Sequence, residues 1–335
     1  MADMRASVVR GIATVLDKAG LMKPFSLAVG HARRGAAFPI LKYHRVNDED
    51  DPFFPALSTD IFERQMAMIA NIYVVLPLEE LVARMMRNAV PRNALAITFD
   101  DGYRDNLTHA APVLARYGLP ASIFLATGFI GSADVPWFDR VAFAFKTCRA
   151  TAWRTSWDET IVLDTLADRL SALDRVLARL KMLPDAEIRG AVDRLLVEVD
   201  SADRRGGKNV MLGWDDVHAL AGLGFSIGAH TISHAILSRI TAERAWTEID
   251  GSRAMIAAAC GRPPRVFAYP NGGAGDYTGA VARLVRDAGF SCAVTTRFGV
   301  NTMTTPLYEL RRGGPWEDHL PTFALKLAGY RLTEA

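Results

Sequence analysis

The chain has 335 residues, of which 50% are hydrophobic and 23% are charged, and its formal net charge is +2. This composition permits a large buried core and argues against general disorder. The near-neutral charge, without a long run of Lys or Arg, gives no support for nucleic-acid binding.

The sequence shows neither a membrane span nor an export signal. No stretch approaches the roughly 20 apolar residues of a span, and the N-terminus lacks the apolar core and small-residue cleavage site of a secretory signal. The three cysteines, Cys148, Cys260 and Cys292, have no metal-ligand spacing and cannot all pair with one another. We therefore expect a cytoplasmic protein with buried or incidental thiols.

The first predicted element is an amphipathic helix over residues 4–21. Its apolar residues recur at helical spacing, with basic residues between them: Met4, Val8, Ile12, Val15, Leu16 and Ala19. Such a helix either packs on the domain, as most amphipathic surface helices do, or lies on an anionic membrane surface. We take residues 1–35 as an N-terminal helical segment and residues 36–335 as one larger domain.

Short apolar runs then alternate with helical patterns. The predicted strands are Ile40–His44, Tyr73–Leu76, Leu95–Asp100, Ser122–Ala126, Ser226–Ala229, Val266–Tyr269 and Cys292–Thr295. The predicted helices are Asp60–Ala70, Leu78–Asn88, Asn106–Tyr117, Trp214–Leu223, Ala242–Cys260 and Thr278–Ala288. This alternation is typical of a parallel sheet or barrel with helices outside, and such folds carry chemistry at the carboxyl ends of their strands.

One section, from about Asp134 to Asn209, interrupts the alternation because no clear strand pattern occurs in it. Leucines mark one helical face: Leu163, Leu166, Leu170, Leu173, Leu177 and Leu180. Pro184 ends this helix, a second follows over Ile188–Val199, and Arg204–Lys208 forms the loop back to the core. We predict an inserted helical hairpin that covers the site, binds the rest of a substrate, or only packs.

Two adjacent carboxylates, Asp100 and Asp101, follow the apolar run Leu95–Phe99. In a loop such a pair is often only a turn or a helix cap. At a strand end the two charges repel, so a cation or a proton must offset one of them. Gly102 lets the backbone turn tightly beside such a cation.

Two imidazoles, His230 and His234, follow the apolar run Ser226–Ala229. A lone His is more often structural than a ligand, but two His four residues apart can bind one cation. One Asp and two His leave positions open for water and substrate, and suit zinc or another first-row divalent ion (Co, Ni, Mn or Fe). The spare Asp is then a candidate proton acceptor.

Two weaker signals stand at other strand ends. His44 ends the first apolar run, where structural burial is the usual reason for a His. The turn Tyr269–Gly273 ends another run, and backbone N–H groups of a Pro/Gly-rich turn can point at a developing oxyanion.

Two segments together resemble the motifs of polysaccharide deacetylases, carbohydrate esterase family four. They are Thr98-Phe99-Asp100-Asp101-Gly102 and His230-Thr231-Ile232-Ser233-His234. Members of that family are metal-dependent enzymes that remove N- or O-acetyl groups from sugar polymers. The resemblance runs from Ile40 to about Arg312, apart from the insertion, and implies a distorted (β/α) barrel of about seven strands.

The resemblance also implies a role for each matched residue. Asp100 matches the general base, and the metal ligands are matched by Asp101, His230 and His234. The Pro/Gly-rich turn is similar to the third family motif, whose backbone forms part of the oxyanion hole, with the N–H of Asn271 as the donor by position.

The sequence departs from the family pattern at two places. Many members have an Arg in the third motif that holds the base, where this chain has Ala268, and Arg311 and Arg312 are candidate substitutes. Many members also keep a general-acid His in a C-terminal motif that is not found here. A circularly permuted branch acting on exopolysaccharides has that His after the first strand as Tyr-His, so His44 matches the catalytic acid.

The reaction that the resemblance implies is deacetylation of an N-acetylhexosamine-containing glycan. Many members of that family act outside the cytoplasm, whereas a cytoplasmic location is expected here. A lipid-linked or nucleotide-linked sugar intermediate at the inner membrane face would reconcile the two. Two alternatives stay open: hydrolysis of a non-sugar amide, and a non-catalytic carbohydrate-binding relative. The second alternative predicts a missing ligand or base, and none is missing. An aromatic groove favours a sugar and a closed pocket a small amide. The candidate residues for stacking on a sugar are Tyr103, Trp137 and Phe138, and Tyr269 is a candidate beside Asn271 at the oxyanion or substrate site.

Overall fold

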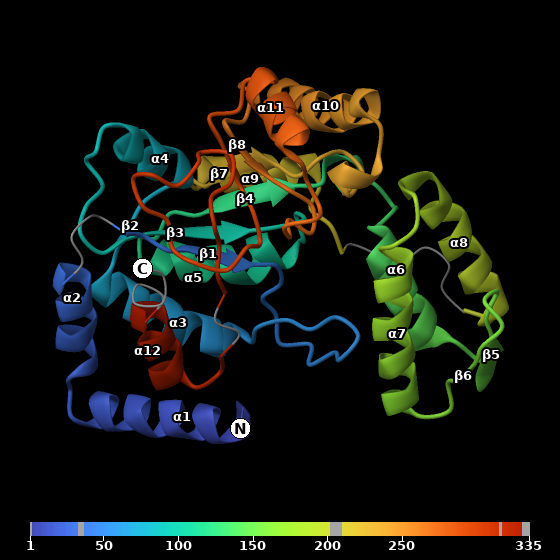
Figure 1. Cartoon of the computed structure of the whole chain (residues 1–335), viewed down its shortest axis with the longest axis horizontal. Coiled ribbons are helices and arrows are strands. Elements are labelled where there is room, and N and C mark those ends of the chain that lie inside the picture. Colours follow the sequence, from blue (N-terminus) through green and yellow to red (C-terminus); the bar gives the residue numbers. More distant parts are fainter. Residues whose placement is uncertain (1, 33–36, 202–209, 315–316, 330–335) are drawn as a thin grey trace.

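The computed structural model describes residues 2–32, 37–201, 210–314 and 317–329. Its centre is a curled parallel sheet with the order β1-β3-β4-β7-β8-β9, in which β2 also pairs with β3 (Figure 1). The strands are β1 (Ile40–Tyr43), β2 (Val74–Val75), β3 (Ala94–Phe99), β4 (Ser122–Leu125), β7 (Ser226–Ala229), β8 (Val266–Ala268) and β9 (Cys292–Val294). All seven predicted strands are present, and the predicted barrel-like fold is confirmed as a parallel half-barrel with helices.

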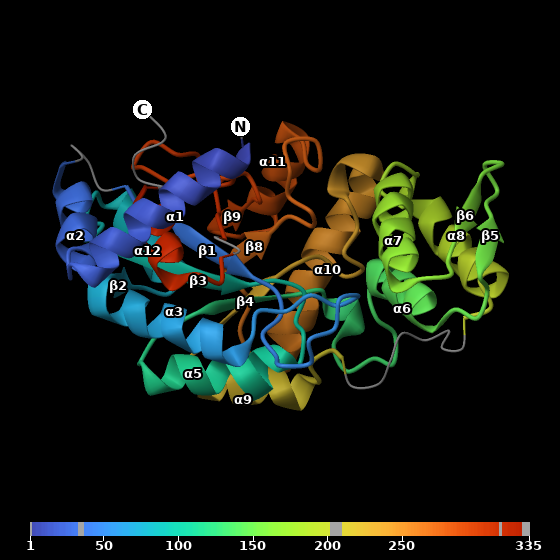
Figure 2. The same cartoon turned by 90° about the horizontal axis from the view of Figure 1, so that it is seen from below.

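Helices cover the outer face of this sheet (Figure 2). They are α3 (Thr59–Ile72), α5 (Ala111–Arg116), α9 (Trp214–Gly222), α10 (Ala242–Cys260), α11 (Gly279–Asp287) and α12 (Leu320–Gly329), with short turns η1 (Asn106–Ala110), η2 (Thr127–Phe129) and η3 (Leu237–Arg239). A further helix, α4 (Leu78–Met86), lies elsewhere. Alternate strand residues such as Ile97 join the core under the helices, whereas Ala96 and Phe124 belong to a separate core inside the curl. Leu81 of α4 packs into that inner core. Both faces of each strand are therefore buried, as parallel sheets require.

The segment Leu310–Gly313 links the two edges of the curled sheet. Leu310 forms a parallel bridge to Val294 of β9, and Gly313 forms one to Leu41 of β1. The segment forms isolated bridges in the structure. The sequence predicts no strand there because the segment has no run of apolar residues. Its position matters because it carries Arg312 between the two strands.

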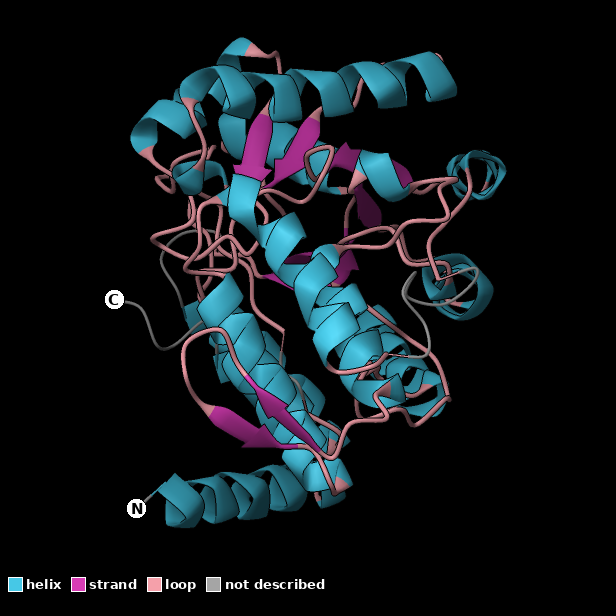
Figure 3. Ribbon diagram, turned by 90° about the vertical axis from the view of Figure 1, so that its right-hand side faces the viewer, coloured by secondary structure: helices cyan, strands magenta, loops and turns pink. Residues whose placement is uncertain are grey.

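The insertion contains α6 (Trp137–Thr147), β5 (Ala152–Arg154), β6 (Thr160–Val162), α7 (Leu166–Leu180) and α8 (Asp185–Glu198) (Figure 3). The prediction of a helical hairpin matches α7 and α8, but the prediction that the section holds no strand is wrong, since β5 and β6 pair antiparallel. Each of these strands has three residues and one buried side chain, Trp153 or Ile161. A strand this short shows no recognisable alternation of apolar and polar residues in the sequence. The predicted loop Arg204–Lys208 lies outside the described residues.

The insertion has a hydrophobic core of its own. Phe145 of α6, Leu173 of α7 and Val192 of α8 meet in it. Phe53 and Phe54, from the loop after β1, pack into the same core. This loop therefore attaches the insertion to the sheet next to the end of β1.

The N-terminal segment forms two helices, α1 (Ala2–Lys18) and α2 (Met22–Ala32), and α1 contacts α12 (Figure 2). Ala13 is fully buried, whereas Val8, Ile12 and Val15 are 56%, 50% and 67% exposed. Most of the apolar stripe seen in the sequence thus faces away from the domain. None of the helices in the described ranges combines the length and apolar character needed to cross a membrane.

Candidate active site

Asp100 and Asp101 stand at the carboxyl end of β3, whose six residues are all buried. The chain turns sharply after them, with φ of 75° at Asp101 and 86° at Gly102. A Cβ at Gly102 would lie 2.9 Å from the Cδ1 atom of Ile130, so both the backbone angle and the lack of space require glycine here. The turn leaves both carboxylates buried, with Asp100 2% and Asp101 4% exposed.

His230 follows β7 directly, and its ring orientation is set by a backbone carbonyl. Its Nδ1 lies 2.7 Å from the carbonyl oxygen of Ala268. A proton on Nδ1 donated to this carbonyl leaves Nε2 free as a ligand, which is the usual arrangement around a metal-binding His.

The three predicted metal ligands converge at one point. The Oδ1 atom of Asp101 lies 3.4 Å from Nε2 of His230 and 3.3 Å from Nε2 of His234. The ligand atoms all lie within 4.8 Å of one another, and all three residues are buried. A tetrahedral ion with bonds of about 2.0–2.1 Å has ligand atoms about 3.3 Å apart, so these spacings fit one divalent cation.

The electrostatics of this cluster also suit a cation. The Oδ1 atom of Asp101 is buried and has no hydrogen-bond partner among the described residues, although such atoms are normally paired. Burial would raise the pKa of Asp101, but His230 and His234 hold it well below its usual range. An ionised carboxylate oxygen without a hydrogen bond lies between two imidazoles. These three side chains form the donor set expected for zinc or a similar ion.

A buried glutamate on α10, which no sequence motif marks, holds the His-bearing loop. One Glu248 carboxylate oxygen accepts hydrogen bonds from the backbone N–H groups of Ile232 and Ser233, both at 2.8 Å. The other accepts one from the Ser233 hydroxyl at 2.7 Å and one from Arg244 at 2.6 Å. Glu248 is fully buried, so this clamp fixes the loop between the two ligands. No signal next to the motif marks it, because it comes from a helix that follows.

Asp100 is held by Arg312. The guanidinium donates to Oδ1 and Oδ2 of Asp100 at 2.6 and 2.7 Å, and also to the Thr295 carbonyl at 2.9 Å. Burial raises the pKa of Asp100, but Arg312 and then His230 outweigh it and lower the pKa to about 2. Of the two arginines suggested by the sequence, Arg312 contacts Asp100, whereas the backbone of Arg311 bonds to Asn301.

His44 follows the last residue of β1 and lies beside the carboxylate pair. The register of β1 on β3 pairs Tyr43 with Phe99, and Asp100 donates its N–H to the Tyr43 carbonyl. Burial lowers the pKa of His44, with Asp101 and Asp100 acting in the opposite direction. The imidazole is thus within electrostatic reach of both carboxylates.

The turn after β8 contains two residues suggested for substrate contact. Asn271 has a φ of 57°, and its N–H has no hydrogen-bond acceptor among the described residues. The Tyr269 side chain, in contrast, is 1% exposed, donates to the Tyr308 carbonyl and stacks on Tyr277 at 4.3 Å. It points into the outer core, so a role for this side chain at the substrate is not supported.

The three suggested sugar-stacking aromatics differ in their positions. Tyr103 is 4% exposed, its hydroxyl donates to Asp139, and Arg45 lies over its ring at 5.0 Å, so its faces are not open to a sugar. Trp137 and Phe138, at the start of α6, are half-buried. Phe138 contacts the ring of His234 edge-on at 5.0 Å, which places this part of the insertion against the site.

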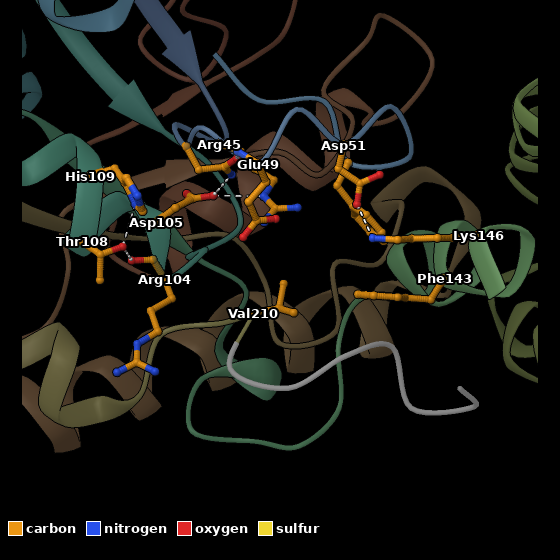
Figure 4. Close-up of a pocket in the computed structure, with 12 residues that line it drawn as sticks. Arg45, Glu49, Asp51, Arg104, Asp105, Thr108, His109, Phe143, Lys146 and Val210 are labelled. Carbon is orange, nitrogen blue, oxygen red and sulfur yellow. Dashed lines mark hydrogen bonds and ion pairs between the residues drawn. The ribbon is translucent and has the colours of Figure 1, made fainter. Parts of the chain in front are cut away.

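A polar cavity of about 310 Å³ lies beside these residues, between the loops after β1 and β3 and helix α6 (Figure 4). Arg45, the residue after His44, lines it and forms an ion pair with Asp105 at 3.0 Å. Lys146 of α6 pairs with Asp51 across it. Its lining therefore combines many charged donors and acceptors with apolar side chains such as Phe54 and Phe143.

Asp139, in the first turn of α6, is a second residue that the sequence did not reveal. It is 5% exposed and accepts a hydrogen bond from the Tyr103 hydroxyl at 3.0 Å. Burial, helped by the charge of Asp101, raises its pKa from 3.8 to about 7. Asp139 is thus a buried carboxyl that titrates near neutral pH.

An Asp139→Asn variant is expected to be more stable than the unchanged chain at pH 8 when both are stripped of metal. Because the pKa of Asp139 is higher in the folded chain, the folded state binds more protons between about pH 4 and 7, and its stability falls as the pH rises through that window. Asparagine does not titrate. Urea unfolding at both ends of the window measures this, and an equal pH dependence in the two chains would contradict it.

Comparisons with known proteins place this chain among relatives of known family. A family model described as polysaccharide deacetylase matches residues 87–293. YxkH of Bacillus subtilis (strain 168), named as a polysaccharide deacetylase, is 36% identical over 98 residues, which is 29% of this chain and 34% of that protein. The match thus spans about a third of that relative.

Solved structures share the fold. IcaB from Ammonifex degensii is 19% identical with a TM-score of 0.57, covering 88% of this chain and 97% of that one. The Streptococcus pyogenes deacetylase PplD, solved with acetate, is 18% identical with a TM-score of 0.56, covering 83% and 92%. Because the family model covers more than half of the residues, the chain belongs to the polysaccharide deacetylase family.

Proposed function

We propose that this chain is a metal-dependent hydrolase that removes N-acetyl, or O-acetyl, groups from a glycan. The observation that carries the proposal is the buried Arg312–Asp100 pair next to the convergent set Asp101, His230 and His234. It provides an ionised carboxylate, held in one orientation, beside three side chains that fit a cation. A purely structural site would need neither a buried Asp101 oxygen without a hydrogen bond nor the adjacent second charge.

The proposed chemistry follows from the positions of these side chains. A cation held by Asp101, His230 and His234 would polarise the acetyl carbonyl and lower the pKa of a bound water. Asp100, kept ionised by Arg312, accepts the proton of the attacking water. The N–H of Asn271, which has no other acceptor among the described residues, donates to the developing oxyanion.

His44 is proposed to protonate the departing nitrogen, since an amine leaves poorly as an anion. Its place after β1, beside Asp100, supports this role and the assignment to the circularly permuted branch. Zinc is proposed as the ion because the ligand spacings suit a tetrahedral site.

A sugar is favoured as the substrate by two features around the site. Trp137 and Phe138 are half-buried aromatics at its edge, and a half-exposed ring can stack on a sugar. The cavity of Figure 4 offers many charged donors and acceptors for hydroxyl groups.

The test is acetate release from a panel of N-acetylhexosamine oligomers, with and without a chelator. We expect release that the chelator abolishes and that added zinc restores. Chelator-insensitive release would contradict the metal mechanism, and release only from small aryl amides or cyclic imides would contradict the sugar substrate. Heat-treated protein with zinc is the control for hydrolysis by the free ion.

We also propose that α1 contacts an anionic membrane surface. Support comes from the exposed stripe Val8, Ile12 and Val15, flanked by exposed Arg10 and Lys18. An Ile12→Asp variant is expected to sediment less with anionic vesicles than the unchanged chain. The control is Thr14→Asp, on another face of α1, which should sediment as the unchanged chain does. If Ile12→Asp also sediments with the vesicles as much as the unchanged chain, the proposal is contradicted. The cytoplasmic location stays a prediction.

A further inference from the structure

The insertion contains a second cavity, of about 280 Å³, formed only by residues of the insertion. It lies between the turn of the β5–β6 hairpin, the C-terminal half of α7, and α8, and Figure 3 shows the side of the molecule that carries these elements. Its floor is apolar and includes Val176, Leu180 and Leu195. The volume is close to the lower end of small-ligand sites, roughly 300 Å³, so it suits one small group.

Two indole rings form one wall of this cavity, and both are held in place. The N–H of Trp153 donates to Glu198 at 2.8 Å, and the N–H of Trp157 donates to Glu159 at 3.1 Å. The rings meet edge to face at 5.3 Å, and the Arg179 guanidinium lies 4.5 Å from the centre of Trp157. Trp153 is 5% exposed and Arg179 covers one face of Trp157, so the open part of the half-buried Trp157 ring is the indole surface available to a ligand. Its fixed position lowers the entropy cost of binding.

The rim of the cavity carries two cations and two carboxylates: Arg179, Arg194, Glu187 and Glu198. The side chains of Arg194 and Glu187 are exposed, and neither side chain has a hydrogen-bond or ion-pair partner among the described residues. The rim charges cancel, which disfavours a polyanion or a polycation. Hydroxyl groups both donate and accept hydrogen bonds, so a rim that offers both kinds of partner suits a neutral polyhydroxylated ligand.

We propose that this cavity binds one neutral pyranose unit of the glycan, away from the catalytic residues. A pyranose ring combines an apolar C–H face, which packs on an indole ring, with equatorial hydroxyls at its edge. The cavity likewise pairs the open part of Trp157 and an apolar floor with a polar rim. This proposal rests on the proposed function for the identity of the polymer. The geometry of the cavity is independent of the catalytic site.

A binding site on the insertion has a specific kinetic consequence. A long chain held at the insertion raises the local concentration of its other units at the active site, while a short oligomer that cannot span both sites gains nothing. The cavity should therefore lower KM for the polymer without changing kcat.

The experiment compares the unchanged chain with an Arg194→Ala/Glu187→Ala double variant and with Arg189→Ala, an exposed arginine of α8 outside the cavity. Indole fluorescence is titrated with the N-acetylglucosamine monomer and hexamer, and a Trp157→Phe variant identifies the signal of this cavity. We expect saturable quenching by both sugars that the double variant weakens, together with a KM for the polymer raised on the order of tenfold. The KM for a dimer, kcat and the Arg189→Ala variant should stay unchanged.

Two results would overturn the proposal: no saturable quenching in the unchanged chain, or equal quenching and equal KM in the double variant. Failure of the proposed function would be seen separately. Sugar binding that requires Arg194 and Glu187 but is accompanied by no acetate release would support the cavity and refute the deacetylase. Acetate release with a double variant that behaves as the unchanged chain would refute the cavity alone.

Discussion

Replacing Arg312 by alanine is expected to lower acetate release by about 10²–10⁴-fold and the free energy of unfolding by about 3–5 kcal/mol. The substitution leaves Asp100 buried without its bidentate partner. Burial then dominates and raises the pKa of Asp100, so the acidic limb of the pH–rate profile should move to higher pH. Urea unfolding and kcat/KM measured from pH 5 to 9 check both parts.

The controls for this prediction separate charge from geometry. Arg311→Ala, at the neighbouring position, should keep near-normal activity because Arg312, and not Arg311, holds both carboxylate oxygens of Asp100. Arg312→Lys should fall between the two, since one ammonium cannot replace the two-pronged contact. An Asp100→Asn/Arg312→Ala double variant should regain part of the lost stability but no activity. A fully active Arg312→Ala chain would refute the proposed role.

An Asp101→Ala variant is expected to lose its bound metal and to lower turnover by about 10³-fold or more, since Lewis-acid stabilisation contributes several kcal/mol. Asp101 is the only carboxylate of the convergent ligand set in the part of the chain that the structure describes. Two imidazoles alone leave a weaker, uncharged site. Metal content after dialysis and acetate release by the same samples measure the loss.

A graded set of variants tests the assignment of Asp101 as a metal ligand. Glu248→Gln keeps all three ligands but weakens the clamp on their loop, so it should reduce metal affinity by about 10–100-fold. Asp134→Ala, an exposed carboxylate at the start of the insertion, is the matched control and should bind metal normally. Retained metal with full turnover in Asp101→Ala would eliminate the assignment of this ligand.

The strands and the candidate metal ligands were largely readable from the sequence because both depend on local order. Apolar runs predicted all seven strands, and the parallel arrangement brings their carboxyl ends to one edge. Asp101 and His230 are the first or second residues after two such strands. Their convergence therefore follows from the topology without knowledge of any side-chain contact.

The partners of these residues depended on the tertiary structure. Arg312 reaches Asp100 across 212 positions of sequence, because the segment Leu310–Gly313 lies between β9 and β1. Glu248 reaches the His-bearing loop from the middle of α10. No periodicity or motif records such contacts, since they arise only when separate elements pack.

The same limit explains the predictions that were wrong. Aromatic residues next to a motif could face either the site or the core, and burial decided against Tyr103 and Tyr269. The short strands of the insertion were likewise decided by packing. The sequence by itself thus determined the sheet, its edge and the candidate metal-ligand set, because strand patterns and residue types are local. Only the tertiary structure decided what holds Asp100 and the ligand loop, because those contacts join residues that the chain keeps far apart.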